Sequence, residues 1–175
     1  MSVRLIILGK QGAGKGTQCK LVSSQFGIPH VSTGDVFRAA VKSGTDLGFA
    51  VKAVIDSGRL VSDELTNDVI RERLSEPDVA NGFLLDGYPR NKIQAGALNE
   101  ILRPNTIDLV IELDIPTDEA IARLASRRIC NKCGAIYGTN KLPRNPLVCD
   151  NCGGEVIQRD DDRAERHRFA HPSRR

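Results

Sequence analysis

Long apolar runs are absent from this sequence of 175 residues. The run at the start, MSVRLIILGK, is too short for a signal peptide, and no later segment approaches the roughly 20 apolar residues that span a bilayer. We therefore expect a cytoplasmic protein without a membrane partner. Internal repeats and low-complexity segments are also lacking. The apolar content of 40% and charged content of 27% are those of an ordinary globular chain.

The net charge is also small, and it is unevenly distributed along the sequence. The formal charge is +3, but residues 163–175 contain five arginines and one glutamate, a charge of +4, so residues 1–162 carry −1. A charge run of this kind is usually a solvated segment. The basic balance is poor evidence for a nucleic-acid partner, and we expect none. We expect residues 163–175 to be a disordered basic tail.

Short apolar segments alternate with helical patterns along the chain. VRLIILG (3–9), GFLLD (82–86) and IDLVIELD (107–114) are typical of strands buried on both faces of a parallel sheet, and GIPHVS (27–32) is a weaker fourth candidate. Helical patterns occupy about 14–25, 34–42, 47–56, 62–74, 91–102 and 116–129. The alternation predicts an α/β fold, a parallel sheet flanked by helices.

The first predicted strand leads into a glycine-rich turn, GKQGAGKGT at residues 9–17, which opens the first helix. In this context successive backbone N–H groups and the helix N-terminus bind phosphate, and Lys15 adds a full positive charge at the terminal phosphates. The segment predicts a P-loop. It departs from the generic pattern because Gly16, and not Ser or Thr, follows the lysine, with Thr17 one position later.

Two later segments predict an acceptor site. STGDVFR begins a helix with Thr33 and places Arg38 about one turn further on, which suits an anion. DGYPR ends a buried strand, so Asp86 suits a magnesium–water network and Arg90 a bidentate phosphate contact. Taken singly, each segment is equally compatible with an ordinary helix start or loop.

Five cysteines in a chain of this kind argue against a disulfide framework. Four of them form two C-x-x-C pairs separated by fifteen residues, namely Cys130, Cys133, Cys149 and Cys152. This spacing predicts a closed tetrahedral zinc site with a folding role, the alternative being reactive or disulfide-bonded cysteines. Cys19 shares a helix face with Val22 and Phe26, so we expect a small buried side chain there.

Together GKQGAGKGTQ, STGDVFR, DGYPRNKIQ and the C-x-x-C pairs resemble bacterial adenylate kinases of the zinc-containing, long-lid type, over about residues 3–165. The GKGT departure is normal in that family. The resemblance implies a monomeric P-loop kinase that transfers the terminal phosphoryl group of MgATP to AMP, giving two ADP. It also implies a core domain of residues 1–31 and 62–128, an AMP-binding helical insert of 32–61 and a zinc lid of 129–162.

The resemblance implies a set of site residues. Those for ATP are Gly12, Ala13, Gly14, Lys15, Gly16, Thr17, Arg123, Arg127, Ile136 and Tyr137. Those for AMP are Thr33, Arg38, Arg59, Leu60, Val61, Gly87, Tyr88, Pro89, Arg90, Arg159 and Gln94, the last reading the adenine edge. The catalytic cations are Lys15, Arg90, Arg123, Arg127 and Arg159, and Asp86 binds magnesium through water.

Two further expectations concern arginines and histidines. Arg123 and Arg127 lie four residues apart, so we expect them on one helix face, sharing an anion. A solvated basic face is the alternative. The three histidines are not expected to form a site.

The resemblance stops at about Glu165, and the final RHRFAHPSRR supplies no fifth strand. We expect the last strand and terminal helices of the fold to be missing, through a shifted reading frame or a truncated gene, with the fourth strand left as an open apolar edge. One alternative function is therefore a nucleotide- and zinc-binding remnant with little turnover. Another is a UMP or CMP kinase, which the long lid and Gln94 disfavour. A zinc-ribbon nucleic-acid module would leave the P-loop unexplained.

Overall fold

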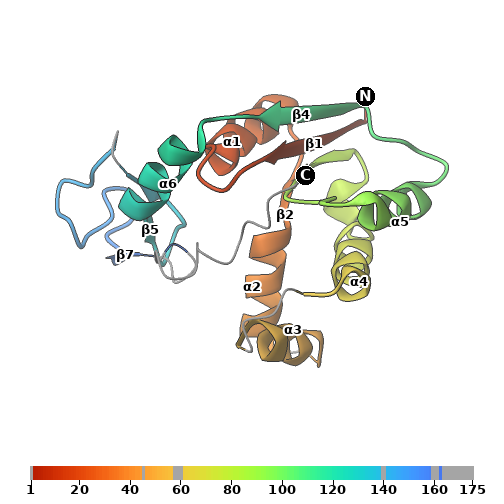
Figure 1. The fold of residues 1–175 in the computed structure, drawn as a ribbon, viewed down its shortest axis with the longest axis horizontal. Helices are drawn as coiled ribbons and strands as arrows, with labels where there is room; N and C mark the ends of the chain where they lie inside the picture. The colour runs from red at the N-terminus through yellow and green to blue at the C-terminus, as the bar shows by residue number, and fades with distance from the viewer. Residues whose placement is uncertain (1, 45, 57–60, 139–140, 159–161, 163–175) are drawn as a thin grey trace. The chain divides into compact units, whose positions relative to one another are not determined.

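The computed structural model describes residues 2–44, 46–56, 61–138, 141–158 and 162 (Figure 1). The chain divides into two compact units, one of residues 1–9 and 14–114 and the other of residues 10–13 and 115–175. The predicted division into core, insert and lid stays a prediction. The predicted tail, Arg59, Leu60 and Arg159 lie outside the described residues. Within the described part of the chain, no helix combines the length and apolar character needed to cross a membrane.

The first unit contains a four-stranded parallel sheet. Its strands are β1 (Val3–Gly9), β2 (His30–Ser32), β3 (Gly82–Asp86) and β4 (Leu109–Leu113), in the order β2-β3-β1-β4. The predicted bounds of β1 and β3 are confirmed, whereas β2 and β4 are shorter than predicted. Parallel neighbours cannot be joined by a tight hairpin, so the chain crosses between them through helices. The α/β prediction is confirmed.

The helices of the first unit have local reasons for their bounds. They are α1 (Lys15–Phe26), α2 (Thr33–Ser43), α3 (Asp46–Asp56), α4 (Asp63–Arg73) and α5 (Lys92–Leu102), with a short 3₁₀ turn, η1 (Pro77–Val79). Side-chain oxygens cap three of the N-termini: Ser32 accepts from Asp35 N, Ser62 from Leu65 N and Asn91 from Gln94 N. Helix α1 has Gly14 at its N-cap, without a side-chain cap.

The sheet is buried on both faces, because alternate residues of its central strands enter different apolar clusters. Ile6 packs in one cluster, while Leu5 and Ile7 pack in the other with Cys19. Cys19 is 0% exposed, which confirms the prediction of a small buried side chain.

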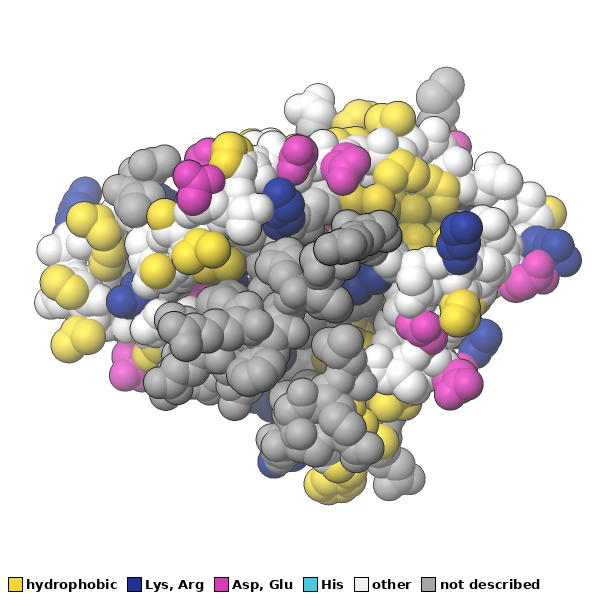
Figure 2. Space-filling model, viewed as in Figure 1, with side chains coloured by type: hydrophobic (Ala, Val, Ile, Leu, Met, Phe, Trp, Pro, Cys, Tyr) yellow, Lys and Arg dark blue, Asp and Glu magenta, His cyan; other side chains and the backbone are white. Residues whose placement is uncertain are grey.

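The edge strand β4 differs from the other strands of the sheet. Leu109 and Val110 are 55% and 52% exposed, and Figure 2 shows hydrophobic side chains at the surface over this strand, along the upper edge of the view. The predicted burial of both faces is therefore wrong for β4, and the predicted open apolar edge is confirmed among the described residues.

The second unit contains α6 (Thr117–Ser126) and an antiparallel sheet of β5 (Arg128–Cys130), β6 (Ile136–Tyr137) and β7 (Val156–Ile157), in the order β6-β5-β7. Its apolar cluster is small and consists of Cys130, Ala135, Tyr137, Cys149 and Val156.

Helix α6 is shorter than the predicted helix of 116–129. It ends at Ser126, and Arg127 follows as the C-cap with an extended ψ of 133°. The prediction that Arg123 and Arg127 lie on one helix face is therefore wrong. The physical reason is tertiary pairing, since residues 128–130 form strand β5 between β6 and β7 and leave the helix geometry.

Candidate functional site

The end of β1 and the start of α1 form one part of the predicted phosphate site. Gly14 has a left-handed φ of 96° at the α1 N-cap, and no side chain caps the helix, so its first N–H groups suit an anion. Lys15 Nζ donates to Gly9 O at 2.8 Å. Gly9 has φ 138°, and a Cβ there would lie 2.3 Å from Leu113 O. Only glycine fits this close approach of β1 to β4.

Residues 10–13 of the turn belong to the second unit, where they are held against α6 and the segment before it. Lys10 Nζ donates to Ile115 O at 3.1 Å, and Arg123 Nη1 donates to Gly12 O at 3.5 Å. Gly12 has φ 84°, and a Cβ there would lie 2.6 Å from Ala120 O. The glycine at this position therefore allows the turn to contact the helix backbone.

Asp86 lies at the carboxyl end of β3, and its side chain is 12% exposed. Thr33 Oγ1 donates to the backbone oxygens of Asp86 and Gly87, at 3.4 and 3.3 Å. His30 Nε2 lies 3.3 Å from Asp86 Oδ2. The expectation that no histidine belongs to a site missed this contact. No signal in the sequence pointed to this contact, which arises because β2 pairs with β3 in a register that sets Ser32 opposite Asp86.

The predicted acceptor arginines lie against glycines. Arg38 Nη2 is 2.5 Å from Asp35 Oδ1 in an exposed ion pair. A Cβ on Gly34 would lie 3.2 Å from the guanidinium nitrogens of Arg38. Arg90 Nε donates to Gly87 O at 2.8 Å, and a Cβ on Gly87 would lie 3.3 Å from Arg90 Nη2. The two glycines thus provide the space that the guanidinium groups occupy.

Gln94 is buried, with 5% exposure, in a network that sequence reasoning did not foresee. Its Oε1 accepts from Arg90 N at 2.7 Å, and its Nε2 donates to Asp63 Oδ1 at 2.7 Å. Asn91 Nδ2 donates to the same carboxylate oxygen at 2.9 Å. Asp63 lies in the first turn of α4, and nothing in the sequence links it to α5. The amide of Gln94 keeps one further N–H and one lone pair for a ligand.

Tyr88 is fully buried beside this network. Its hydroxyl donates to Asn67 Oδ1 at 2.7 Å, and burial raises the pKa of Tyr88 to about 12. The tyrosine therefore stays neutral, and its ring packs in the core cluster on one face of the sheet. Asn67 is a second partner that the sequence pattern did not reveal.

The two arginines of α6 and its C-cap that were predicted to bind ATP, Arg123 and Arg127, bind different carboxylates. Arg123 Nη2 lies 2.5 Å from Glu119 Oε1 in an exposed pair. Arg127 makes a bidentate pair with Asp162, through Nε to Oδ2 at 2.6 Å and through Nη2 to Oδ1. The Asp162 side chain is 0% exposed and that of Arg127 is 18% exposed. Asp162 is the third residue that sequence reasoning missed.

The four paired cysteines come together in the second unit, and their sulfur atoms all lie within 4.8 Å of one another. Cys130 Sγ and Cys152 Sγ are 3.5 Å apart, and Cys133 Sγ and Cys149 Sγ are 3.6 Å apart. Four sulfurs about 2.3 Å from a tetrahedral zinc ion would be separated by about 3.8 Å, whereas a disulfide needs about 2.0 Å. The group therefore fits zinc.

Hydrogen bonds to two of the four sulfurs favour the thiolate form that zinc requires, whereas the neighbouring cysteine sulfurs raise the pKa of Cys133 to about 12. The Tyr137 hydroxyl donates to Cys149 Sγ at 3.3 Å and lowers the pKa of Cys149 to about 6. The backbone N–H of Cys133 lies 3.5 Å from Cys130 Sγ and lowers the pKa of Cys130. Both effects act before any metal is bound, so part of the cost of forming thiolates is already met by the fold.

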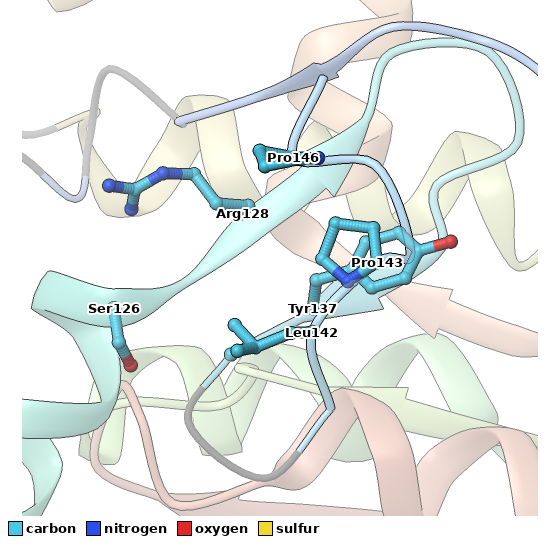
Figure 3. A pocket seen from close by; sticks show the side chains of 7 residues that line it. Ser126, Arg128, Tyr137, Leu142, Pro143 and Pro146 are labelled. Atoms are coloured by element: carbon cyan, nitrogen blue, oxygen red, sulfur yellow. The ribbon is translucent and has the colours of Figure 1, made fainter. Parts of the chain in front are cut away.

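Tyr137, predicted to contact ATP, is 1% exposed, and its hydroxyl also accepts from Asp150 N at 2.8 Å. Any contact between Tyr137 and a nucleotide would therefore be made by the backbone of Tyr137. Beside it lies a pocket of about 400 Å³, lined mainly by apolar side chains that include Leu142 and Pro143. Figure 3 shows the Arg128 guanidinium pointing away from the Tyr137 ring. Ile136 is half-buried on β6.

Comparison with known proteins identifies the family. The adenylate kinase family model matches residues 7–172, which runs seven residues past the predicted end of the resemblance at Glu165. An adenylate kinase of Acetivibrio thermocellus is 48% identical over 166 residues, covering 93% of this chain and 76% of the relative. That of Bacillus licheniformis is 51% identical over 163 residues, covering 91% of this chain and 75% of the relative. The chain thus spans about three quarters of the length of these relatives, and it belongs to the adenylate kinase family.

Proposed function

We propose that this nucleoside monophosphate kinase transfers the terminal phosphoryl group of magnesium-bound ATP to AMP, reversibly, giving two ADP. The observation that carries the proposal lies within the first unit. The Lys15-bearing N-terminus of α1 follows β1, and Asp86 ends the neighbouring parallel strand β3. Ligands of α/β proteins bind at this carboxyl edge of a parallel sheet.

The donor phosphates would bind to the glycine-rich turn. The uncapped N-terminus of α1 supplies backbone donors and the positive end of the helix dipole. Lys15 would exchange its bond to Gly9 O for phosphate oxygens. Gly12, Ala13, Gly14, Gly16 and Thr17 supply the backbone around it.

Asp86 would hold magnesium through bound water. Its carboxylate lies at the strand end, and Mg²⁺ prefers oxygen ligands and keeps several waters. When bound with ATP, magnesium neutralises charge that develops on the phosphate oxygens. The residues of this chain orient the ion and the phosphates, since phosphoryl transfer needs alignment and spread positive charge more than covalent help.

The acceptor nucleotide would bind beside α2 and the segment after β3. Arg38 is half exposed and can leave its surface pair with Asp35 at little cost. Arg90 and Gly87 lie next to Thr33, and Gln94 presents its remaining amide donor and acceptor to an adenine edge. Val61, Tyr88 and Pro89 complete the described part of this proposed set, together with Arg59, Leu60 and Arg159 outside it.

Arg123 and Arg127 are the proposed phosphate cations of the second unit. Arg123 sits in an exposed pair that a phosphate can replace. Arg127 uses Nε and Nη2 for Asp162, so its Nη1 edge can donate to a phosphate while the pair stays intact. In this interpretation Asp162 positions Arg127 rather than neutralising the site.

Zinc would be held by the four paired cysteines and would act in folding. A closed Cys₄ set leaves no position for substrate, and the small apolar cluster around it gives little other stability. We propose that residues 129–162 form a lid that excludes water from the reaction. We also propose a monomeric, cytoplasmic enzyme.

A nucleotide- and zinc-binding remnant with little turnover remains the second candidate. The observation that favours it is the open apolar edge of β4, since Leu109 and Val110 lack cover from the described residues. A scaffold with an uncovered edge is expected to hold its cations less firmly in place.

A coupled assay of ADP formation, with AMP, UMP and CMP as acceptors, tests the proposal. We expect AMP to be preferred and Lys15→Met to lower turnover by roughly 10²–10³-fold, the loss typical of one positioned electrostatic donor. Lys20→Met on the exposed face of the same helix is the matched control and should keep turnover. Equal turnover with Lys15→Met would overturn the mechanism. Tight nucleotide binding without turnover would favour the remnant.

A further inference from the structure

We infer that Cys19, His30 and Asp86 form a second metal site, for a divalent transition metal such as Zn²⁺ or Co²⁺, separate from the four paired cysteines. One ligand atom from each residue lies within 4.8 Å of the other two. The three side chains come from α1, β2 and β3 of the first unit. The sequence pattern predicts only a packing role for Cys19 and no site for His30.

One pair of ligand atoms in this cluster has the separation of a tetrahedral site, and the Cys19 sulfur lies within 4.8 Å of both. His30 Nε2 and Asp86 Oδ2 are 3.3 Å apart, which matches the separation of about 3.3 Å for two ligands at about 2.0–2.1 Å from one zinc ion. Cys19 is 0% exposed, and the side chains of His30 and Asp86 are 20% and 12% exposed. The residues stand on regular elements, which hold ligands more firmly than loops do. Three protein ligands leave a fourth position for water or a phosphate oxygen.

The chemistry of the donors selects the metal. Thiolate and imidazole ligands favour zinc and cobalt, whereas magnesium prefers oxygen ligands alone. A thiolate, a neutral imidazole and a carboxylate balance the charge of a divalent ion, so no net charge is buried. Without metal Cys19 stays a thiol, because burial and then the charge of Asp86 raise its pKa to about 12. Binding therefore releases the Cys19 proton to solvent.

The position of the cluster gives it a consequence for the reaction. Asp86 is also the residue proposed to hold magnesium through water. A zinc or cobalt ion bound by Cys19 and His30 takes that carboxylate, so these metals inhibit phosphoryl transfer in competition with magnesium. This consequence rests on the proposed function, whereas the binding of metal does not.

Metal stoichiometry of the full chain tests the binding. The four-cysteine site is first filled with one equivalent of Zn²⁺, Co²⁺ is titrated, and bound metal is measured by elemental analysis and by the thiolate-to-cobalt charge-transfer band. We expect two metal equivalents in the wild-type chain. Cys19→Ala and His30→Gln should each weaken the second equivalent by about 100-fold or more, since loss of a supporting contact alone costs 10–100-fold. Cys149→Ala is the matched control and should lose only the first equivalent.

The inference is overturned if the wild-type chain binds only one metal equivalent, or if Cys19→Ala binds two metal equivalents tightly. The assay of ADP formation separates the two proposals. If the second equivalent binds but extra magnesium does not relieve its effect on turnover, the metal site stands and the magnesium role of Asp86 fails. If turnover is normal and the second equivalent is absent, the function stands and the metal site fails.

Discussion

The two units of this chain are stabilised by different means. The sheet of the first unit has apolar clusters on both faces, built from the strands and from α1, α4 and α5. The cysteine segment, residues 128–157 of the second unit, has one cluster of five buried residues, of which two are cysteines. The first unit therefore depends on buried apolar area, whereas we expect the cysteine segment to depend on a metal ion held by its cysteines.

The polar interactions differ in the same way. In the first unit Gln94, Asn91 and Asp63 satisfy one another through several hydrogen bonds. In the second unit Arg127, which directly follows α6, forms an ion pair with the buried side chain of Asp162. Removal of one partner from a buried ion pair leaves an uncompensated charge, so we expect the Arg127–Asp162 pair to be sensitive to substitution.

Removal of zinc should have the largest effect, and only on the cysteine segment. Structural zinc contributes about 10–16 kcal/mol of apparent binding energy in zinc-finger peptides. We expect a chelator, or Cys149→Ala, to abolish hydrogen-exchange protection of β5 and β7 and to leave that of β1 and β3. Cys19→Ala is the control and should keep β5 protected. An ordered cysteine segment in metal-free protein would contradict the comparison.

Shortening a buried side chain on the central strand β3 should destabilise the first unit. Leu84 on β3 is 0% exposed, so Leu84→Ala should lower the free energy of unfolding by about 4 kcal/mol through lost burial and the cavity left behind. Urea denaturation followed by circular dichroism measures this. Val110→Ala on the exposed β4 is the matched control and should cost under about 1 kcal/mol. Similar losses at both positions would mean that β4 is covered in solution.

The buried ion pair offers a smaller test within the second unit. Asp162→Ala leaves Arg127 without its partner and should destabilise the α6–β5 junction by about 3 kcal/mol. Local hydrogen exchange at β5 reports the change. Glu119→Gln removes the exposed partner of Arg123 and should cost under about 1 kcal/mol. Equal effects of the two substitutions would show that the Arg127 pair is solvated.

The smallest effect is a pH dependence in the first unit. Burial raises the pKa of Tyr88 to about 12, from about 10 in an unfolded chain. The folded state holds the phenolic proton more tightly, so its contribution is fully present below about pH 10 and is lost as pH rises toward 12. We expect a loss of about 2 kcal/mol. Denaturation of wild type and Tyr88→Phe at several pH values isolates the contribution of Tyr88. Parallel pH profiles of the two proteins would refute the prediction.

Local pattern was sufficient to predict the elements that carry a strong short-range signal in the sequence. β1 and β3 have their predicted bounds because an apolar run between turn signals leaves little choice. The cysteine cluster was predicted by spacing alone, since C-x-x-C pairs bring sulfurs together over short loops. The end of α6 was not, because the pairing of residues 128–130 with β6 and β7 depends on chain that folds around them.

The partners of the candidate site were the least predictable part. Asp63 lies 31 residues from Gln94, and Asp162 lies 35 residues from Arg127. An acid at such a separation carries no periodic signal, since hydrogen bonds between elements follow from packing. The same holds for Cys19 and His30 beside Asp86, which come together only through the strand order β2-β3-β1.

The amino-acid sequence by itself determined the parallel α/β sheet, the phosphate-binding turn and the cysteine spacing, because each depends on neighbouring residues or a short period. Tertiary structure alone decided which carboxylates hold Gln94 and Arg127, where α6 ends, and that a thiol, an imidazole and a carboxylate meet beside β3. These features require distant segments to pack against one another, and burial then fixes their hydrogen bonds and charges.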